Sequence, residues 1–439
     1  MKSSTTLSLL AVAVSLLLAG CDDGAKIDPV KQTGPNPELP AAKNFLVPPM
    51  QVPSGTPWKE GEKPKVAEGL KIEKVADGLL HPRQLYTLPN GDVLVVEASG
   101  PKAPVSQPKQ LITGLVKNAS GKGGPGGNRI TLLRSSDDGK TWQKYPFLEN
   151  LRSPFGVQLV GDTLYVANAD SLMKYRYESG ATKITDPGTE LTELPGGPIN
   201  HHWTKALLAS QDGSKLYVGV GSNSNITENG IGAEYRRAAI LEVDAATGAS
   251  RIYASGLRNP TGMQWEPQTG KLWAIVNERD EIGADLVPDY MTTVQEGGFY
   301  GWPYSYYGQH VDERAQPQRA DLVKKAIKPD YALSSHVAPL GLWFYTGTNL
   351  PEKYRGGAFV SEHGSWNRKP LNGYQVVWVA FRDGVPQGNP EPVVTGFLTD
   401  DQESVRGLPV GLTMDKQGGL MIADDAGNVV WRVTSATTP

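Results

Sequence analysis

One pattern recurs along most of this 439-residue chain: an apolar-alternating strand, a turn that contains glycine, and a second alternating strand. Alternation of apolar and polar residues on both sides of such a turn is typical of a β-hairpin. Six copies occur, around Gly91, Gly161, Gly213, Gly270, Gly357 and Gly418. Further hairpins, such as RITLLRSSDDGKTWQKY and AAILEVDAATGASRIY, stand between them. Repetition of one unit at intervals of tens of residues favours a radial arrangement of β-sheets.

These repeats predict an all-β fold, a six-bladed β-propeller over residues 66–436. Each repeated hairpin supplies half of a four-stranded blade, and the strands between the copies complete it. The abundance of glycine (50) and proline (34) fits many short strands joined by turns. A pair of β-sandwich domains is the alternative, but it would not explain why the same hairpin recurs over the whole length.

The first 21 residues resemble a lipoprotein signal peptide. Lys2 is the only positive charge, and the apolar run Leu7 to Leu18 is too short to span a bilayer. The run ends in LAGC, which resembles the bacterial lipobox, so we expect a lipid on Cys21 and a protein anchored on the periplasmic side of the cell envelope. Residues 22–65 are rich in Pro, Lys, Gly and Glu, and we expect a flexible tether there.

Cysteine usage and charge exclude several classes of function. Cys21 is the only cysteine, so the chain has no internal disulfide, no CxxCH haem attachment and no cysteine-based zinc or iron–sulfur site. The net charge is −3 and no basic run occurs, which argues against a nucleic-acid partner.

Basic residues precede the first strand of every repeated hairpin. They are Arg83, Arg152, His201 with His202, Arg258, His336 and Arg406. In a propeller these positions converge at one mouth of the central channel. Cations gathered there repel one another unless an anion is present, so the pattern predicts an anionic ligand. For any single arginine, an ion pair with a neighbouring blade is the alternative.

The adjacent histidines admit two interpretations. Taken alone, His201 and His202 are expected to hydrogen-bond in the loop and cap the third hairpin. Their place in phase with Arg258 and Arg406 instead favours His201 as a catalytic group held at the end of a rigid sheet. His202 is then a neighbour that packs beside it.

Three segments carry a family resemblance: NHHWTK from 200, GLRNPTG from 256 and EGGFYGWPY from 296. In this order they resemble the glucose/sorbosone dehydrogenase family of soluble-type quinoproteins, six-bladed propellers that bind pyrroloquinoline quinone (PQQ) and calcium. DLVPDY, HVAPLG and HGSWNR look most like the sorbosone dehydrogenase branch. The resemblance covers residues 70–434 and implies oxidation of an aldose or a sugar aldehyde, with electrons passed to an external acceptor because no haem site is present.

The resemblance also assigns roles. It implies that His201 is the general base, with Lys205 four residues after it, that Arg258 stabilises charge on the quinone, and that Asn259 orients the cofactor. PQQ is a tricarboxylate, which fits the anionic ligand inferred above. The other residues expected to contact it are Lys205, Arg368, Arg406 and Trp366 of HGSWNR. The expected calcium ligands are the main-chain oxygens of Glu278 and Arg279, with Asp285 and Asp289 as a further site.

Alternatives remain at this point. A one-residue shift would make His202 the base. Asn200 stands where glucose-oxidising members carry an aspartate, and its amide could still accept a hydrogen bond from the histidine ring. Tyr300 and Trp302 could wall a pocket or pack in the core, and core packing is favoured. The rival functions are a non-catalytic propeller that binds protein or glycan, and a metal-dependent lactonase-type hydrolase.

Overall fold

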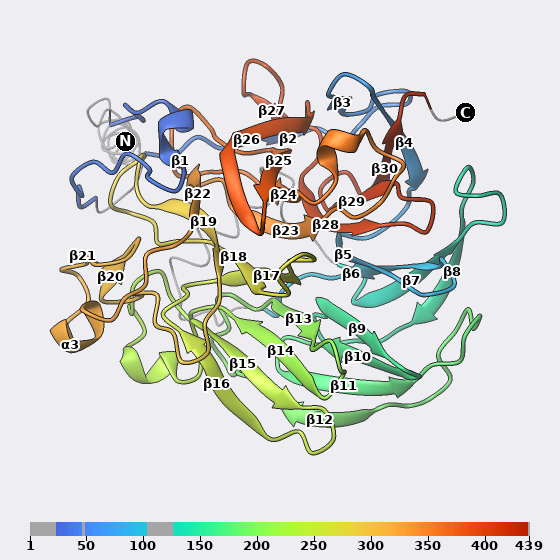
Figure 1. The fold of residues 1–439 in the computed structure, drawn as a ribbon, viewed down its shortest axis with the longest axis horizontal. Coiled ribbons are helices and arrows are strands. Elements are labelled where there is room, and N and C mark those ends of the chain that lie inside the picture. The colour runs from blue at the N-terminus through green and yellow to red at the C-terminus, as the bar shows by residue number, and fades with distance from the viewer. Residues whose placement is uncertain (1–22, 46–48, 103–125, 438–439) are drawn as a thin grey trace, which may run out of the picture.

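The computed structural model describes residues 23–45, 49–102 and 126–437. Its strands form six antiparallel sheets arranged around a common centre (Figure 1). Blades 1 to 3 follow chain order: β5 (Pro82–Thr87), β6 (Val93–Glu97), β7 (Arg129–Arg134), β8 (Gln143–Leu148); β9 (Gly156–Val160), β10 (Thr163–Ala167), β11 (Ser171–Arg176), β12 (Thr189–Glu193); β13 (Lys205–Ala209), β14 (Lys215–Val220), β15 (Ala239–Asp244), β16 (Ser250–Ser255). The predicted all-β six-bladed propeller is confirmed.

Blades 4 to 6 each take a strand from the N-terminal part of the chain. They are β17 (Pro260–Trp265), β18 (Leu272–Val276), β19 (Pro288–Thr293), β22 (Tyr331–Ser335) with β1 (Thr33–Gly34); β23 (Pro339–Phe344), β24 (Ala358–Glu362), β25 (Gln375–Arg382), β26 (Val385–Thr395) with β3 (Lys65–Val66); β28 (Pro409–Met414), β29 (Leu420–Asp424), β30 (Val429–Ser435) with β4 (Leu70–Ala76). The ring is therefore closed in blade 6, where β4 pairs with the C-terminal strand β30.

The repeated hairpins form the inner half of each blade. The first strands, β5, β9, β13, β17, β23 and β28, contact one another around the centre. The turn glycines Gly91 and Gly213 have φ of +96° and +72°, which a residue with a Cβ rarely adopts. The fifth copy differs from the expectation, because Gly357 lies just ahead of β24 and not in a tight turn. There η3 (Glu352–Tyr354) lies in the connection between β23 and β24.

The apolar side chains lie between neighbouring blades. The second strands β6, β18, β24 and β29 are buried along their whole length, because each faces an adjacent blade on both sides. Between blades 6 and 1, for example, Leu85, Val93 and Val95 pack against Met421 and Val430. Burial of each such side chain contributes about 1.5–3 kcal/mol, so the blade interfaces stabilise the ring.

The N-terminal segment was expected to be a tether, but its described residues pack on the propeller. Gln32, in η1 (Pro29–Gln32), is fully buried; its Nε2 donates to the Asp285 carbonyl oxygen (2.6 Å) and its Oε1 accepts from Ser335 Oγ (2.9 Å). β2 (Ser54–Gly55) pairs with β27 (Ser404–Val405). Hydrogen bonds and isolated apolar contacts, such as Trp58 against Trp431, hold this segment, so it carries no apolar periodicity. The predicted signal peptide and Cys21 lie outside the described residues.

Blade 4 contains an insertion between β19 and β22. It holds β20 (Ser305–Tyr306), β21 (His310–Val311) and α3 (Ala320–Val323). Tyr300 and Trp302 are buried here, so the prediction that they pack in the core is confirmed. Trp302 Nε1 donates to the carbonyl oxygen of Asn225 (3.0 Å), which lies beside the site described below.

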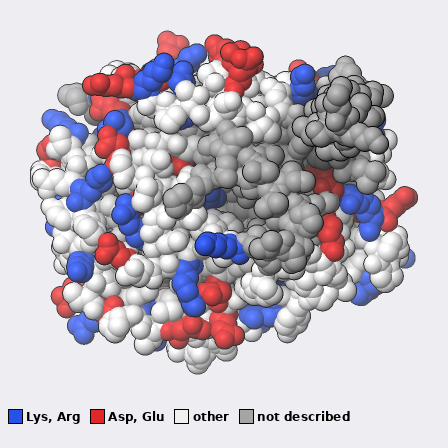
Figure 2. All heavy atoms as spheres, turned by 180° about the vertical axis from the view of Figure 1, so that it is seen from behind, with Lys and Arg blue, Asp and Glu red and all other residues white. Residues whose placement is uncertain are grey.

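The surface carries charges of both signs. In the view from behind (Figure 2), Lys and Arg are interspersed with Asp and Glu over the described part of this face, in line with the small net charge of −3. Within the described ranges, no helix is long and apolar enough to cross a bilayer.

Candidate functional site at the channel mouth

Four arginines at or just before the start of an inner strand each lie opposite a carboxylate. The pairs are Arg83–Asp425 (2.9 Å), Arg152–Asp170 (3.4 Å), Arg258–Asp280 (3.8 Å) and Arg406–Glu62 (3.5 Å). Acidic residues thus offset the charge of these arginines, so the arginines alone do not require an anionic ligand. Three of the four acids closely follow the second strand of a repeated hairpin, at the same mouth of the channel.

The histidine pair lies in the loop between β12 and β13. The two rings are 4.5 Å apart between centroids and meet edge to face. The His201 backbone N–H donates to Asn223 Oδ1 (3.1 Å). His202 Nδ1 lies 2.8 Å from the carbonyl oxygen of Ser222, and a carbonyl can only accept, so this nitrogen carries a proton. Burial, and then the neighbouring His201 and Arg258, hold the pKa of His202 well below its ordinary value.

Asn200 does not orient the ring of His201. Its Oδ1 accepts from an Arg237 Nη2 (2.9 Å) and lies 3.4 Å from Lys205 Nζ, while its Nδ2 donates to the Ala169 carbonyl oxygen (3.0 Å). The Asn200 amide was expected to accept a hydrogen bond from the histidine ring, but its partners are Arg237, Lys205 and Ala169. The position is part of the site, but its side chain points to other partners.

Two buried cations lie under the histidine loop. Lys205 is 0% exposed and donates to the Trp203 carbonyl oxygen (3.0 Å); burial, with Arg237 nearby, sets its pKa well below the ordinary value. Burial also lowers the pKa of Arg237, to about 10, and Glu234 opposes that shift. Among the described residues, neither cation forms an ion pair with a carboxylate. Their side chains are therefore held by main-chain and amide oxygens in the part of the chain that the structure describes.

Arg258 and Asn259 lie next to the histidine loop at the start of β17. The guanidinium of Arg258 donates to the carbonyl oxygens of Glu278 (2.7 Å) and Asn225 (3.2 Å). Asn259 is buried, and its Oδ1 has no hydrogen-bond partner among the described residues. A Cβ on Gly221 would lie 2.3 Å from that oxygen and 2.4 Å from the His202 Cβ, so glycine is what lets these groups approach.

A polar network connects this wall to blade 5. Asp280 Oδ1 accepts from Asn367 Nδ2 (2.8 Å) and lies 3.1 Å from His336 Nδ1, while His336 Nε2 lies 3.0 Å from the Gly283 carbonyl oxygen. Burial would raise the pKa of Asp280, but His336 and Arg258 outweigh it and hold that pKa below its usual range. Burial would lower the pKa of His336, and the Asp280 hydrogen bond more than reverses this. The ring faces acceptors on both nitrogens, as an imidazolium does.

The carboxylates expected to bind a metal have other partners. Asp289 accepts from the backbone N–H groups of Glu278 (2.7 Å) and Ala338 (2.9 Å). Asp285 Oδ2 accepts from the backbone N–H of Lys26 (2.6 Å). In the part of the chain that the structure describes, no three His, Cys, Asp or Glu side chains are grouped to hold a metal ion. The main-chain oxygens of Glu278 and Arg279 remain predictions as calcium ligands.

Two expected cofactor residues lie against the N-terminal segment instead, and a third lies against blade 4. Arg406 pairs with Glu62, and the Trp366 carbonyl oxygen accepts from the backbone N–H of Gln51 (3.1 Å). Arg368 donates to Ser335 Oγ (3.3 Å) and lies 3.8 Å from Asp285. No hydrogen bond or ion pair among the described residues joins these three to the histidine loop, and their partners are Glu62, Gln51, Ser335 and Asp285.

Sequence reasoning missed residues that support the site from below. They are Asn223, Glu234, Arg237 and Asp425. Asp425 has a signal in the sequence, because acids recur just after the second strand of the hairpins, in VANAD, VNERD and ADD. Arg237 has no such signal, because it follows an irregular loop and its partners are three main-chain oxygens and the Asn200 amide.

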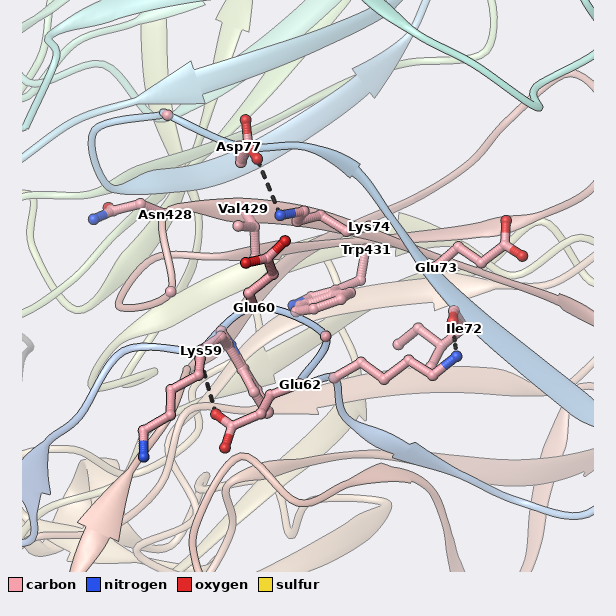
Figure 3. A pocket seen from close by; sticks show the side chains of 15 residues that line it. Lys59, Glu60, Glu62, Ile72, Glu73, Lys74, Asp77, Asn428, Val429 and Trp431 are labelled. Atoms are coloured by element: carbon pink, nitrogen blue, oxygen red, sulfur yellow. Dashed lines mark hydrogen bonds and ion pairs between the residues drawn. The ribbon is translucent and has the colours of Figure 1, made fainter.

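A pocket of about 690 Å³ lies elsewhere, against the outermost strands of blade 6 (Figure 3). Lys74 and Asp77 pair across 3.0 Å, and Trp58 and Trp431 lie among its lining residues. Lysines and acids are mixed in this pocket, and no histidine lines it. It therefore differs from the channel mouth in position and chemistry.

Residues 79–365 match the family model described as Glucose / Sorbosone dehydrogenase, and residues 308–436 match one described as TrAA12-like. A pyrroloquinoline quinone-dependent sugar dehydrogenase of Hypocrea jecorina is 24% identical over 420 residues, covering 83% of this chain and 87% of that protein. The holo form of the pyranose dehydrogenase PQQ domain from Coprinopsis cinerea has a TM-score of 0.68 at 20% identity, over 88% of this chain and 100% of that chain. The calcium structure of the Trichoderma reesei Carbohydrate-Active Enzymes Family AA12 has a TM-score of 0.67 at 20% identity, over 90% and 99%.

At these identities the solved structures show the shared propeller fold. The sequence match carries more, because it runs from the start of blade 1 through the end of β24 and includes the histidine loop, Arg258 and Asn259. It spans well over half of the chain, and the resemblance seen in the motifs is thereby confirmed: this chain belongs to the glucose/sorbosone dehydrogenase family.

Proposed function

We propose that the protein is a PQQ-dependent dehydrogenase that oxidises an aldose or a sugar aldehyde such as sorbosone and passes the electrons to an external acceptor. Family membership supports the reaction class, and the H. jecorina relative is a PQQ-dependent sugar dehydrogenase. One observation carries the proposal: the His201–His202 pair lies beside Arg258 and Asn259, above the buried cations Lys205 and Arg237.

The residues at the channel mouth fit a planar tricarboxylate. Asn259 offers a buried amide whose oxygen lacks a partner, and such a group is rare unless a ligand or water meets it. Arg258 is fixed by backbone carbonyls, so it can hold positive charge next to the cofactor without reorganising. Arg258 and Asn259 would therefore hold the cofactor, whereas Arg368 and Arg406 already lie opposite Asp285 and Glu62.

Oxidation of a sugar C1 hydroxyl removes a proton from oxygen and a hydride from carbon, and PQQ supplies the hydride acceptor when it is bound. His201 takes the proton in this proposal. Its ring is partly exposed at the mouth, where a substrate hydroxyl can reach it, and Asn223 fixes its backbone. His202 is the weaker base, because its pKa is lowered and its Nδ1 is bound to Ser222.

Calcium is proposed on the main-chain oxygens of Glu278 and Arg279, which are hard donors suited to this ion. The Glu278 oxygen also accepts from Arg258 (2.7 Å), so the ion would use its second lone pair. The calcium structure of the T. reesei relative supports the idea at the level of the fold. Chelation with EDTA should then abolish activity, and Ca²⁺ should restore it. Full activity after exhaustive chelation would contradict this assignment.

The test compares the two histidines in purified protein supplied with PQQ and Ca²⁺. His201→Ala should lower kcat by about 10²–10⁴-fold and leave PQQ binding, read from tryptophan fluorescence quenching, nearly unchanged. His202→Ala should cost less. Loss of kcat in His202→Ala alone would make His202 the base. No spectral response of the wild-type protein to PQQ would reject the cofactor, and a screen of aldoses and sorbosone would identify the substrate.

We also propose that Cys21 carries the lipid that anchors the protein on the periplasmic side of the envelope. The LAGC sequence supports this proposal. Cys21→Ser should remove incorporation of labelled fatty acid and release the protein from the membrane fraction. Unchanged membrane association without the label would point to another mode of attachment.

A further inference from the structure

Arg237 lies beneath the loop that carries the two histidines. It stands between η2 (Ile231–Glu234) and β15, and it is 6% exposed. Its guanidinium donates to the carbonyl oxygens of Pro195 (3.2 Å), Gly196 (3.0 Å) and Gly221 (3.3 Å), and to Asn200 Oδ1 (2.9 Å). One side chain thus connects the beginning and the middle of the histidine loop to the end of β14.

Asn200 connects Arg237 to the position of His201, the next residue in the chain. Its Nδ2 donates to Ala169 in blade 2, and its Oδ1 lies between Arg237 and Lys205. The side chain directly before His201 is therefore held between two blades. Replacing Arg237 would remove the shorter of the two hydrogen bonds that the Asn200 oxygen accepts. The loop could then shift.

Glu234 supports the other side of the loop. Its carboxylate accepts from the Asn223 backbone N–H (2.7 Å) and from Ser224 Oγ (2.6 Å), and Asn223 Oδ1 in turn accepts from the His201 N–H (3.1 Å). Glu234 and Arg237 are three residues apart in one turn of chain. The backbone of His201 is thus located by contacts that start from this single segment.

We propose that Arg237 is a positioning residue for the proton-transfer step: it fixes the backbone before His201 and so determines where that ring meets the substrate hydroxyl. The inference rests on the proposed function, because it takes His201 as the base. Glucose-oxidising members carry an aspartate at the position of Asn200. In this chain Arg237 would take over the positioning of the histidine, through the loop backbone and the Asn200 amide.

The chemistry of arginine suits this task. Burial of a guanidinium is costly unless its donors are used, and within the described chain Arg237 has no carboxylate at ion-pair distance. Its donors go to oxygens of two segments, 195–200 and 221. A planar fork of N–H groups can hold several carbonyls in fixed directions, whereas a lysine ammonium in the same place reaches fewer of them.

The test is Arg237→Met in the full chain, with two independent readouts. Hydrogen exchange of the peptide that covers residues 195–204 should become faster in the apo-protein, with exchange elsewhere unchanged. With PQQ, Ca²⁺ and sugar, kcat should fall by about 100-fold, as expected when a catalytic group is displaced by about 1 Å, while PQQ affinity stays nearly constant. Arg237→Lys should recover part of kcat.

Arg236→Met is the matched control, because Arg236 donates to Ser250 Oγ (2.7 Å) and makes no contact with the loop in the hydrogen bonds described. It should behave as the wild type. Unchanged loop exchange or wild-type kcat in Arg237→Met would overturn the proposal. So would faster exchange throughout the propeller with loss of PQQ binding, which would indicate a general structural role. If wild-type protein shows no PQQ-dependent activity, the proposed function fails, and loop exchange alone decides whether Arg237 holds the loop.

Discussion

Glu362 ends β24 with its carboxyl group inside the propeller. It is 2% exposed; its Oε1 accepts from Gln375 Nε2 (3.2 Å), and its Oε2 has no partner among the described residues. Burial raises its pKa well above the ordinary value, the Gln375 hydrogen bond opposes this, and Asp289 adds to it. The folded protein therefore holds a proton here at pH values where the unfolded chain has lost it.

This difference predicts a pH-dependent gain from Glu362→Gln. When the folded pKa of an acid is raised, the free energy of unfolding falls as pH increases above the unfolded pKa, near 4.5. The amide has no proton to lose, so the variant should be more stable than the wild type at pH 8, by about 1 kcal/mol, and the gain should shrink towards pH 4. Denaturant unfolding at several pH values measures it.

Glu352→Gln is the control, because the Glu352 side chain is 90% exposed and should show no such slope. A gain in Glu362→Gln that is the same at pH 4 and pH 8 would contradict the assignment of the buried proton to Glu362.

At the residue scale, the sequence predicted where the site residues lie, but it did not predict the direction in which their side chains point. The repeated hairpins predicted that Arg258 and His201 lie at one channel mouth, since both precede inner strands. They did not predict that Arg258 faces the Glu278 and Asn225 carbonyl oxygens, or that Asn200 turns away from His201. The direction of a side chain depends on partners that are distant in the sequence, and no local pattern encodes them.

The N-terminal segment is the element whose role differs most from its sequence. Gln32 ends η1 and connects it to two blade-4 segments, through the Asp285 carbonyl and Ser335 Oγ. β1 then extends the same sheet, with Thr33 opposite Leu333. The segment is therefore an additional edge of blade 4 and a cover over its loops.

Gln32→Leu should destabilise this attachment. It keeps the approximate size of the side chain but leaves the buried Asp285 carbonyl oxygen without its donor, which costs about 1–3 kcal/mol. The expected outcome is a lower melting temperature and faster proteolysis between residues 33 and 45. Lys31→Leu, at an exposed neighbouring position, should change neither. Equal proteolysis of Gln32→Leu and the wild type would mean that β1 pairing alone holds the segment.

Elements held by apolar packing were predictable, and this segment was not. Alternating apolar residues mark β5–β6 or β13–β14, because each hairpin buries side chains between blades. The N-terminal segment buries a glutamine and uses main-chain hydrogen bonds, such as Ala25 N–H to the Lys369 carbonyl oxygen (2.8 Å). Its composition therefore resembles that of a linker.

At the scale of the whole molecule, repetition was the strongest signal. Six copies of one hairpin could bury their apolar faces only against one another, which favours a closed ring. The way in which the ring closes was not visible in the repeats, because β4 belongs to no copy. It joins β30 as the outer strand of blade 6, so the two ends of the propeller meet in one sheet.

That seam should be the place where the ring opens, since only strand pairing between β4 and β30 connects the ends within the sheet. Lys71 lies opposite Thr434, and facing residues of antiparallel strands have Cα separations that suit a disulfide. The double variant Lys71→Cys with Thr434→Cys should be more stable when oxidised by about 2–4 kcal/mol, because the bond restricts the unfolded chain over nearly the whole domain. The reduced form of the same variant is the control. If mass spectrometry confirms the bond and both forms melt at the same temperature, separation of β4 from β30 does not limit unfolding, and the ring opens between two other blades.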